Sequence, residues 1–233
     1  MNKKSTKNQG FTLLELLIVI AIIAILSVIL VLVLDPSETL KKSRDSQRMS
    51  DLSTIKTALG LYSTSVTAPY MAGVASNAGC KGSTSSDAAY AAGDKIYYSY
   101  PSDAPGAAIT DVALDAGSAS VPAAVQVLNA NLALTDGTGW LPVNLSGLPS
   151  GSPISNLPID PVNTVATPSA VANTDLVYRY VCSEKTLKYE IDAKLESTAY
   201  TVDDNKMAKD GGNNANYFEV GTDLKLLGTG TDF

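Results

Sequence analysis

The most distinctive pattern in the chain is an almost unbroken apolar run over residues 11–34, interrupted near its start by a single carboxylate, Glu15. As a helix, this run would be about 36 Å long, which is enough to cross a bilayer. A charge within such a helix is expensive in hydrocarbon, so it usually marks a functional contact. The pattern therefore predicts a membrane-spanning helix in which Glu15 has a specific role.

A second helix is predicted directly after the apolar run, over residues 35–65. Asp35, Pro36 and Glu38 form a helix-start signal, with an N-cap carboxylate, a proline at the first helical position and a glutamate at the third. An apolar stripe at spacings of three and four then predicts one face packed on a head, through Met49, Leu52, Ile55, Leu59 and Tyr62. The opposite face is charged and is assigned either to solvent or to ion pairs between subunits, through Lys41, Lys42, Arg44, Asp45, Arg48 and Asp51.

Residues 66–233 are predicted to form a globular head with a small antiparallel sheet and long loops. Strict alternation over residues 187–196 predicts a strand with one face on the core and the other in water. Further strands are predicted within residues 95–100, 176–182 and 217–220, and apolar spacing over residues 120–134 predicts a helix. The expected fold class is therefore α+β, a long N-terminal helix packed on a small sheet.

The segment before the apolar run adds a more specific signal. Residues 1–10 hold three lysines and no acid, yet no small-x-small triplet follows the apolar run, so removal as an ordinary signal peptide is not expected. A basic leader, Gly10, Phe11, Thr-Leu-Leu, Glu15 and a long apolar helix together resemble the signature of type IV prepilins. The resemblance implies that prepilin peptidase cuts between Gly10 and Phe11, removing residues 1–10, and that Phe11 is then N-methylated.

Cleavage would also explain the carboxylate in the apolar helix. The new α-amine of Phe11 stays cationic after methylation, and in a stack of parallel helices it can pair with Glu15 of a neighbour. A lone carboxylate in apolar surroundings costs several kcal/mol, so this pairing would select the register that compensates the charge. Glu15 is therefore predicted to align subunits during assembly.

The resemblance implies a structural subunit of a type IV pilus-like surface filament. Its partners would be copies of itself and other pilins, prepilin peptidase, the assembly platform and the membrane. The leader lysines favour a cytoplasmic N-terminus with the head outside, so the chain would lie in the cytoplasmic membrane before it joins an extracellular filament. Two alternatives stay open, a pseudopilin of a type II secretion system and a membrane-anchored adhesin that never polymerises.

Composition argues against other classes of function. Residues 1–65 carry a net charge of +3 and residues 66–233 a net charge of −9, so binding of nucleic acid through the head is not expected. The chain contains no histidine, which excludes histidine-based triads and histidine-built zinc sites within it. We therefore expect no enzyme activity and no cofactor other than a metal ion considered below.

The chain has two cysteines, Cys80 and Cys182. In an exported head, a disulfide between them is favoured over two free buried thiols. The closed loop would contain about 100 residues, which corresponds to at most about 4.7 kcal/mol in the chain-entropy model. This placement departs from the pilin disulfide near the C-terminus.

Oxygen ligands gather in one turn-rich stretch near the C-terminus. Asp203, Asp204 and Asp210 supply the hard ligands that calcium prefers, although their spacing matches no EF-hand and a solvated turn is the alternative. The segment over residues 157–161, Leu-Pro-Ile-Asp-Pro, also resembles the head of type II secretion pseudopilins, some of which bind calcium in a C-terminal loop. The sequence therefore gives a weak calcium prediction.

Overall fold

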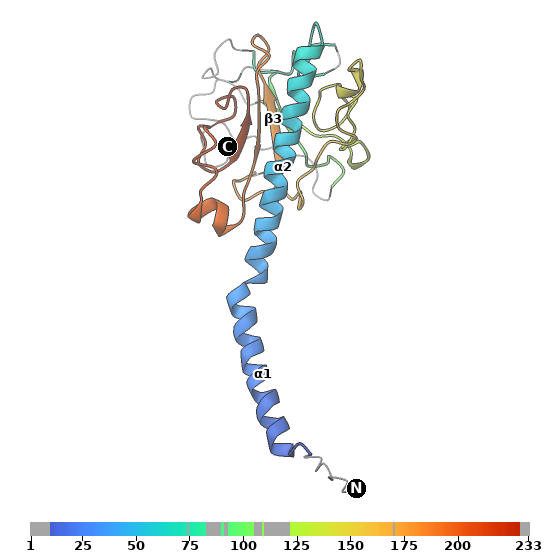
Figure 1. The fold of residues 1–233 in the computed structure, drawn as a ribbon. Helices are drawn as coiled ribbons and strands as arrows, with labels where there is room; N and C mark the ends of the chain where they lie inside the picture. The colour runs from blue at the N-terminus through green and yellow to red at the C-terminus, as the bar shows by residue number, and fades with distance from the viewer. Residues whose placement is uncertain are drawn as a thin grey trace, which may run out of the picture. The chain divides into compact units, whose positions relative to one another are not determined.

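A computed structural model of the chain describes residues 10–73, 75–82, 90, 93–104, 109, 122–169 and 171–228. The chain divides into two compact units, Met1–Lys41 and Lys42–Phe233. The first unit contains helix α1, Leu13–Leu34, and the first residues of helix α2, Pro36–Ser65. The second unit contains the rest of α2 and a five-stranded sheet (Figure 1). The predicted α+β class is confirmed.

A single residue, Asp35, separates the two helices. It adopts a left-handed conformation with φ 33° and ψ 79°. Pro36 explains the break, because proline has no N–H to donate and disfavours a helical conformation in the residue before it. Glu38 N then donates to Asp35 Oδ1 at 3.3 Å, so Asp35 caps α2 as the sequence predicts.

The apolar stripe of α2 forms part of the core of the head. Leu52, Ile55, Leu59 and Tyr62 are buried in one cluster with aromatic and aliphatic side chains of the sheet and loops, whereas Met49 is only half-buried. Tyr178 of strand β3 reaches the same helix, and its hydroxyl donates to Asp51 Oδ2 at 2.9 Å. Figure 1 shows α2 running beside β3.

The sheet is mixed, with strand order β2-β1-β3-β4-β5. Its strands are β1 Lys95–Tyr98, β2 Ala123–Val125, β3 Tyr178–Cys182, β4 Tyr189–Ala193 and β5 Phe218–Gly221. The pairs β1–β3, β3–β4 and β4–β5 are antiparallel, as predicted, but β2 lies parallel to β1. A parallel neighbour needs a crossover connection, which the prediction of a small antiparallel sheet did not include.

The predicted helix over residues 120–134 is wrong within the part of it that the structure describes. Ala123–Val125 form β2, and only a short 3₁₀ turn, Asn129–Asn131, follows. Backbone pairing with β1 and the side chain of Gln126, which accepts from Ile109 N and donates to Tyr100 O, hold this stretch extended. Tertiary pairing therefore outweighs the helical spacing of its apolar residues, and residues 120 and 121 lie outside the described part.

The water-facing side predicted for β4 is also wrong, because Glu190 and Asp192 are buried. A second apolar cluster, which includes Leu226 and Leu227 of the C-terminal segment, covers that face of the sheet. Glu190 Oε2 accepts from the backbone N–H groups of both leucines, at 2.7 and 2.8 Å, and Asp192 pairs with Arg179. Burial, together with the neighbouring Glu219 carboxyl, raises the pKa of Glu190 well above its usual range.

Candidate processing and assembly site

The predicted cleavage point lies just before α1, in backbone that belongs to no helix or strand. Gly10 and Phe11 are both exposed, and 85% of the surface of Phe11 is open to solvent. A Cβ added to Gly10 would meet no atom within 4 Å. The fold of this chain therefore does not itself require glycine at that position. Any requirement for glycine must come from a partner protein that binds the segment.

Glu15 takes part in a capping box with Thr12, the N-cap of α1. The backbone N–H and the hydroxyl of Thr12 both donate to Glu15 Oε2 at 3.0 Å, and Glu15 N donates to Thr12 Oγ1 at 3.2 Å. A negative charge in the first turn also interacts favourably with the helix dipole. Thr12 was not among the predicted site residues, although the Thr-x-x-Glu spacing of a capping box is present in the chain.

The surface of α1 is apolar on every side, and all of its described side chains are exposed. Ser27, the other polar residue of α1, donates its hydroxyl to Ile23 O at 2.7 Å, so the hydroxyl needs no acceptor outside the helix. With 22 residues, α1 is about 33 Å long and apolar enough to cross a membrane by length and composition. Such a surface needs lipid or other apolar helices around it.

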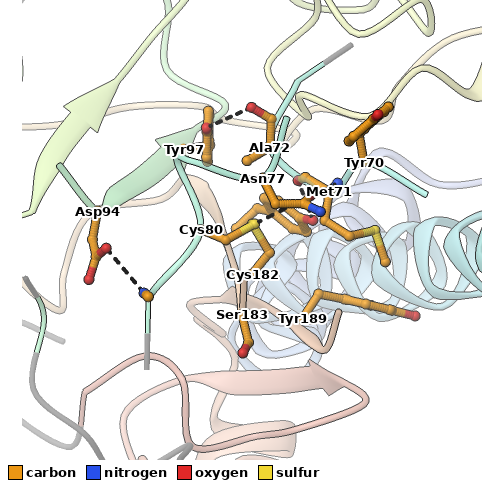
Figure 2. Close-up of a disulfide and its surroundings, with 12 residues drawn as sticks. Tyr70, Met71, Ala72, Asn77, Cys80, Asp94, Tyr97, Cys182, Ser183 and Tyr189 are labelled. Atoms are coloured by element: carbon orange, nitrogen blue, oxygen red, sulfur yellow. Dashed lines mark hydrogen bonds between the residues drawn. A yellow bond between two sulfur atoms is a disulfide. The ribbon is translucent and has the colours of Figure 1, made fainter. Parts of the chain in front are cut away.

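A disulfide joins Cys80 to Cys182, the last residue of β3 (Figure 2). Both cysteines are buried, their Cα atoms are 4.7 Å apart, and their sequence separation is 102 residues. Backbone contacts accompany the bond, because Lys81 N donates to Cys182 O at 2.7 Å. Asn77 braces the same loop, since its Oδ1 accepts from Met71 N at 2.6 Å. The disulfide thus ties the segment after α2 to the centre of the sheet.

Replacing Cys80 with serine is expected to lower the free energy of unfolding of the head by about 2–5 kcal/mol, because the unfolded chain gains freedom when a long loop is opened. Denaturant titration of the full chain in detergent measures this change. Reduction of the wild-type protein is the matched comparison and should produce a similar loss. Peptide mapping of the unreduced protein that finds both thiols free would contradict the prediction.

Charged residues of α2 form an ion cluster inside the head. Arg48 is fully buried and contacts Asp45 at 2.8 Å, Asp160 at 2.6 Å and Glu196 at 2.6 Å. Arg44 joins from the rim, with its Nε 2.8 Å from Glu196. Burial alone would lower the pKa of Arg48, but its bonds to Asp160 and the other carboxylates outweigh burial and raise it.

This cluster corrects the sequence prediction for the charged face of α2. Asp45, Arg48 and Asp51 were assigned to solvent or to pairs between subunits, and all three are buried within the head. Each has a partner there, since Asp45 also accepts from Ser197 N at 2.7 Å and Asp51 accepts from Tyr178 and Gln47. Lys42 keeps its predicted exposure.

The three aspartates of the calcium prediction make separate local contacts. Asp204 pairs with Lys206 at 2.5 Å and with Lys209 at 2.6 Å, while Asp203 is exposed. Asp210 accepts from the backbone of Gly212 and of Glu219, each at 2.8 Å. Within the described part of the chain, no group of three or more His, Cys, Asp or Glu side chains is placed to hold a metal ion. Calcium binding stays a prediction.

Comparison with known proteins points to the same N-terminal segment. The family model described as Prokaryotic N-terminal methylation motif matches residues 5–31. A search of curated proteins and a search of solved structures found no match. The matched stretch contains Gly10, Phe11, the Thr12–Glu15 capping box and most of α1, whose length and apolar surface fit membrane anchoring of a pilin. The N-terminal segment of this chain is therefore the prepilin-type cleavage and methylation motif of type IV pilins and pseudopilins.

Proposed function

We propose that the chain is a structural subunit of a type IV pilus-like surface filament and that it polymerises through α1. The observation that carries this proposal is the surface of α1, which is apolar on every side except for one carboxylate fixed at its first turn. Lipid satisfies that surface while the subunit is stored in the membrane, and α1 helices of other subunits satisfy it in a filament. The role is assembly and needs no catalytic group.

Processing supplies the group that makes assembly specific. Prepilin peptidase cuts between Gly10 and Phe11, and the cationic amine of Phe11 then pairs with the Glu15 carboxylate of a neighbour. Both charges leave water, so the pair is favourable only in a register that brings them into contact. The amine and the carboxylate together thus select one axial arrangement of the helices.

The proposed location follows from the same segment. The basic leader stays on the cytoplasmic side, α1 crosses the cytoplasmic membrane, and the head lies outside. The assembly platform then moves the processed subunit from the membrane into the filament, together with copies of itself and other pilins.

The mature chain is expected to begin at methylated Phe11, because the peptidase cuts after Gly10 and the apolar helix is retained. Mass spectrometry of the protein isolated from its native cells measures the N-terminus. Gly10→Val is the matched variant, since a side chain at this position meets nothing within 4 Å and leaves the fold undisturbed. The Gly10→Val chain should accumulate with its leader still attached. An intact Met1 in the wild-type protein, or a cut beyond Leu34, would show that the proposal is wrong.

A pseudopilin of a type II secretion system is the second candidate. The segment over residues 157–161 resembles the heads of those proteins, and its Asp160 is buried against Arg48 in the ion cluster. Deletion of the gene separates the two candidates. Loss of surface filaments in electron micrographs supports a pilus, whereas loss of secreted proteins from cells with an unchanged set of surface filaments supports a secretion pseudopilus.

A further inference from the structure

One oxygen of the Glu15 carboxylate is fixed by its own helix. Oε2 accepts from both the backbone N–H and the hydroxyl of Thr12, and the Glu15 backbone N–H donates back to that hydroxyl. An unrestrained glutamate side chain samples many rotamers, and the two bonds from Thr12 to Oε2 favour the rotamer that turns back toward Thr12. Thr12 therefore determines where the charge lies.

The second oxygen of the same carboxylate is open. Among the residues that the structure describes, Oε1 of Glu15 accepts no hydrogen bond, while a carboxylate has about four lone-pair sites to offer. Cleavage after Gly10 leaves the capping box whole, because Thr12 and Glu15 both lie in the mature chain. The mature helix can thus keep its cap and accept a further donor at Oε1.

The capping box holds the charge near the level of Thr12 along the helix. The side chain of Glu15 folds back by three residues to reach Thr12, which at 1.5 Å per residue corresponds to about 4.5 Å toward the N-terminus. A partner group must meet the carboxylate at that height and not beside the backbone of Glu15. Any register selected by this charge therefore depends on Thr12.

We infer that Thr12 is a positioning residue for assembly, which holds the Glu15 carboxylate at its own level with Oε1 free to accept the Phe11 amine of a second copy of this chain. This inference rests on the proposed function. It adds that the specificity of the contact comes from two residues, and that the uncut chain already carries the acceptor in its assembled geometry.

The test compares substitutions at Thr12 in the full chain expressed in its native cells. Thr12→Val keeps the branched shape and removes the hydroxyl, whereas Thr12→Ser keeps the hydroxyl. Filament yield is measured relative to the amount of processed chain, so that any effect on cleavage is divided out. We expect Thr12→Val to lower this yield about fivefold or more, the factor that corresponds to a lost N-cap, and Thr12→Ser to stay within about twofold of the wild type.

Register is the readout that a merely structural role of Thr12 would not change. Helical reconstruction of the remaining Thr12→Val filaments should show an altered axial offset between neighbouring α1 helices, by up to about 4.5 Å, while Thr12→Ser filaments keep the wild-type offset. Thr12→Ala, which also lacks the hydroxyl, replaces Thr12→Val if the valine variant yields too little processed chain. Ser27→Ala removes another hydroxyl from α1 outside the cap and should leave both yield and offset unchanged.

Wild-type yield and offset in Thr12→Val would overturn the inference, and so would equal losses in Thr12→Ser or in Ser27→Ala. Failure of this inference is distinguishable from failure of the proposed function. If a chain without the Glu15 charge forms normal filaments, the pairing of Glu15 with the Phe11 amine is ruled out. If that chain forms defective filaments while Thr12→Val forms normal ones, only the role of Thr12 is ruled out.

Discussion

Filament yield of Glu15→Ala is expected to fall at least about a hundredfold, while membrane insertion and leader cleavage continue. The loss follows because the amine of a neighbour's Phe11 would be buried without its partner, and breaking a buried ion pair costs about 3–5 kcal/mol. Insertion is unaffected or eased, since the variant removes the one charge from the apolar helix. Electron microscopy of cell surfaces and mass spectrometry of the membrane fraction measure the two effects.

Glu15→Gln separates charge from shape in this experiment. Glutamine retains the size of the side chain and the capacity to form a capping box, so a similar loss of filaments would assign the effect to the charge. Glu38→Ala removes an acid just beyond α1 and is the control for a general effect of charge on export. Normal filament yield in Glu15→Ala would rule out selection of register by this residue and favour the membrane-anchored adhesin that never polymerises.

The head is expected to lose about 3–5 kcal/mol of its free energy of unfolding in Arg48→Met. Methionine fills a similar volume, but it leaves Asp45 and Asp160 buried without the guanidinium that both of them contact. Each carboxylate keeps its backbone N–H donors but loses the positive charge that offsets the cost of its burial. Denaturant titration of the full chain in detergent, monitored by near-ultraviolet circular dichroism, measures the loss.

Arg44→Met is the matched control for this variant. Arg44 is partly exposed, and its ion-pair partner within the described part of the chain is Glu196 at the rim, so its removal should cost at most about 1 kcal/mol. Equal losses in the two variants would mean that the buried ion pairs of Arg48 contribute no more to stability than the partly exposed pair of Arg44. A combined change of Arg48, Asp45 and Asp160 to uncharged residues of similar size should recover part of the stability, because it leaves no charge unpaired.

Both helices could be predicted from the sequence because their signals are local. An unbroken apolar run such as that of α1 forms a helix in hydrocarbon, because a helix satisfies the backbone hydrogen bonds within the segment. Pro36 and Asp35 mark the helix break at the residue where the structure has it. The stripe of α2 repeats at helical spacing and is buried as expected, except at Met49, which is half-buried. The motif over residues 5–31 could be predicted for the same reason, since it is contiguous, and the roles of Gly10, Phe11 and Glu15 within it stay predictions.

The parts that sequence reasoning missed depend on residues far apart in the chain. Glu190 and Asp192 alternate with apolar neighbours as if they faced water, but the C-terminal segment around Leu226 covers them. Arg48 looked like a surface charge because two of its three carboxylate partners, Asp160 and Glu196, lie 112 and 148 residues away. The spacing of residues within one helix or strand does not show which distant residues contact it. An alternating pattern in a strand shows which side chains are polar, but it does not show whether another segment covers the polar face.

The same long separations determine the order in which the head can form. As the chain is made from its N-terminus, α2 is complete about 95 residues before Asp160 and more than a hundred residues before Tyr178 and Glu196, which are partners of its buried positions. Contacts this distant along the chain make folding slow, since the entropy of closing long loops is lost before these contacts can compensate it. The stripe of Leu52, Ile55 and Leu59 therefore cannot be completely buried until β3 and β4 have been made, and it is the surface that a chaperone would have to cover until then.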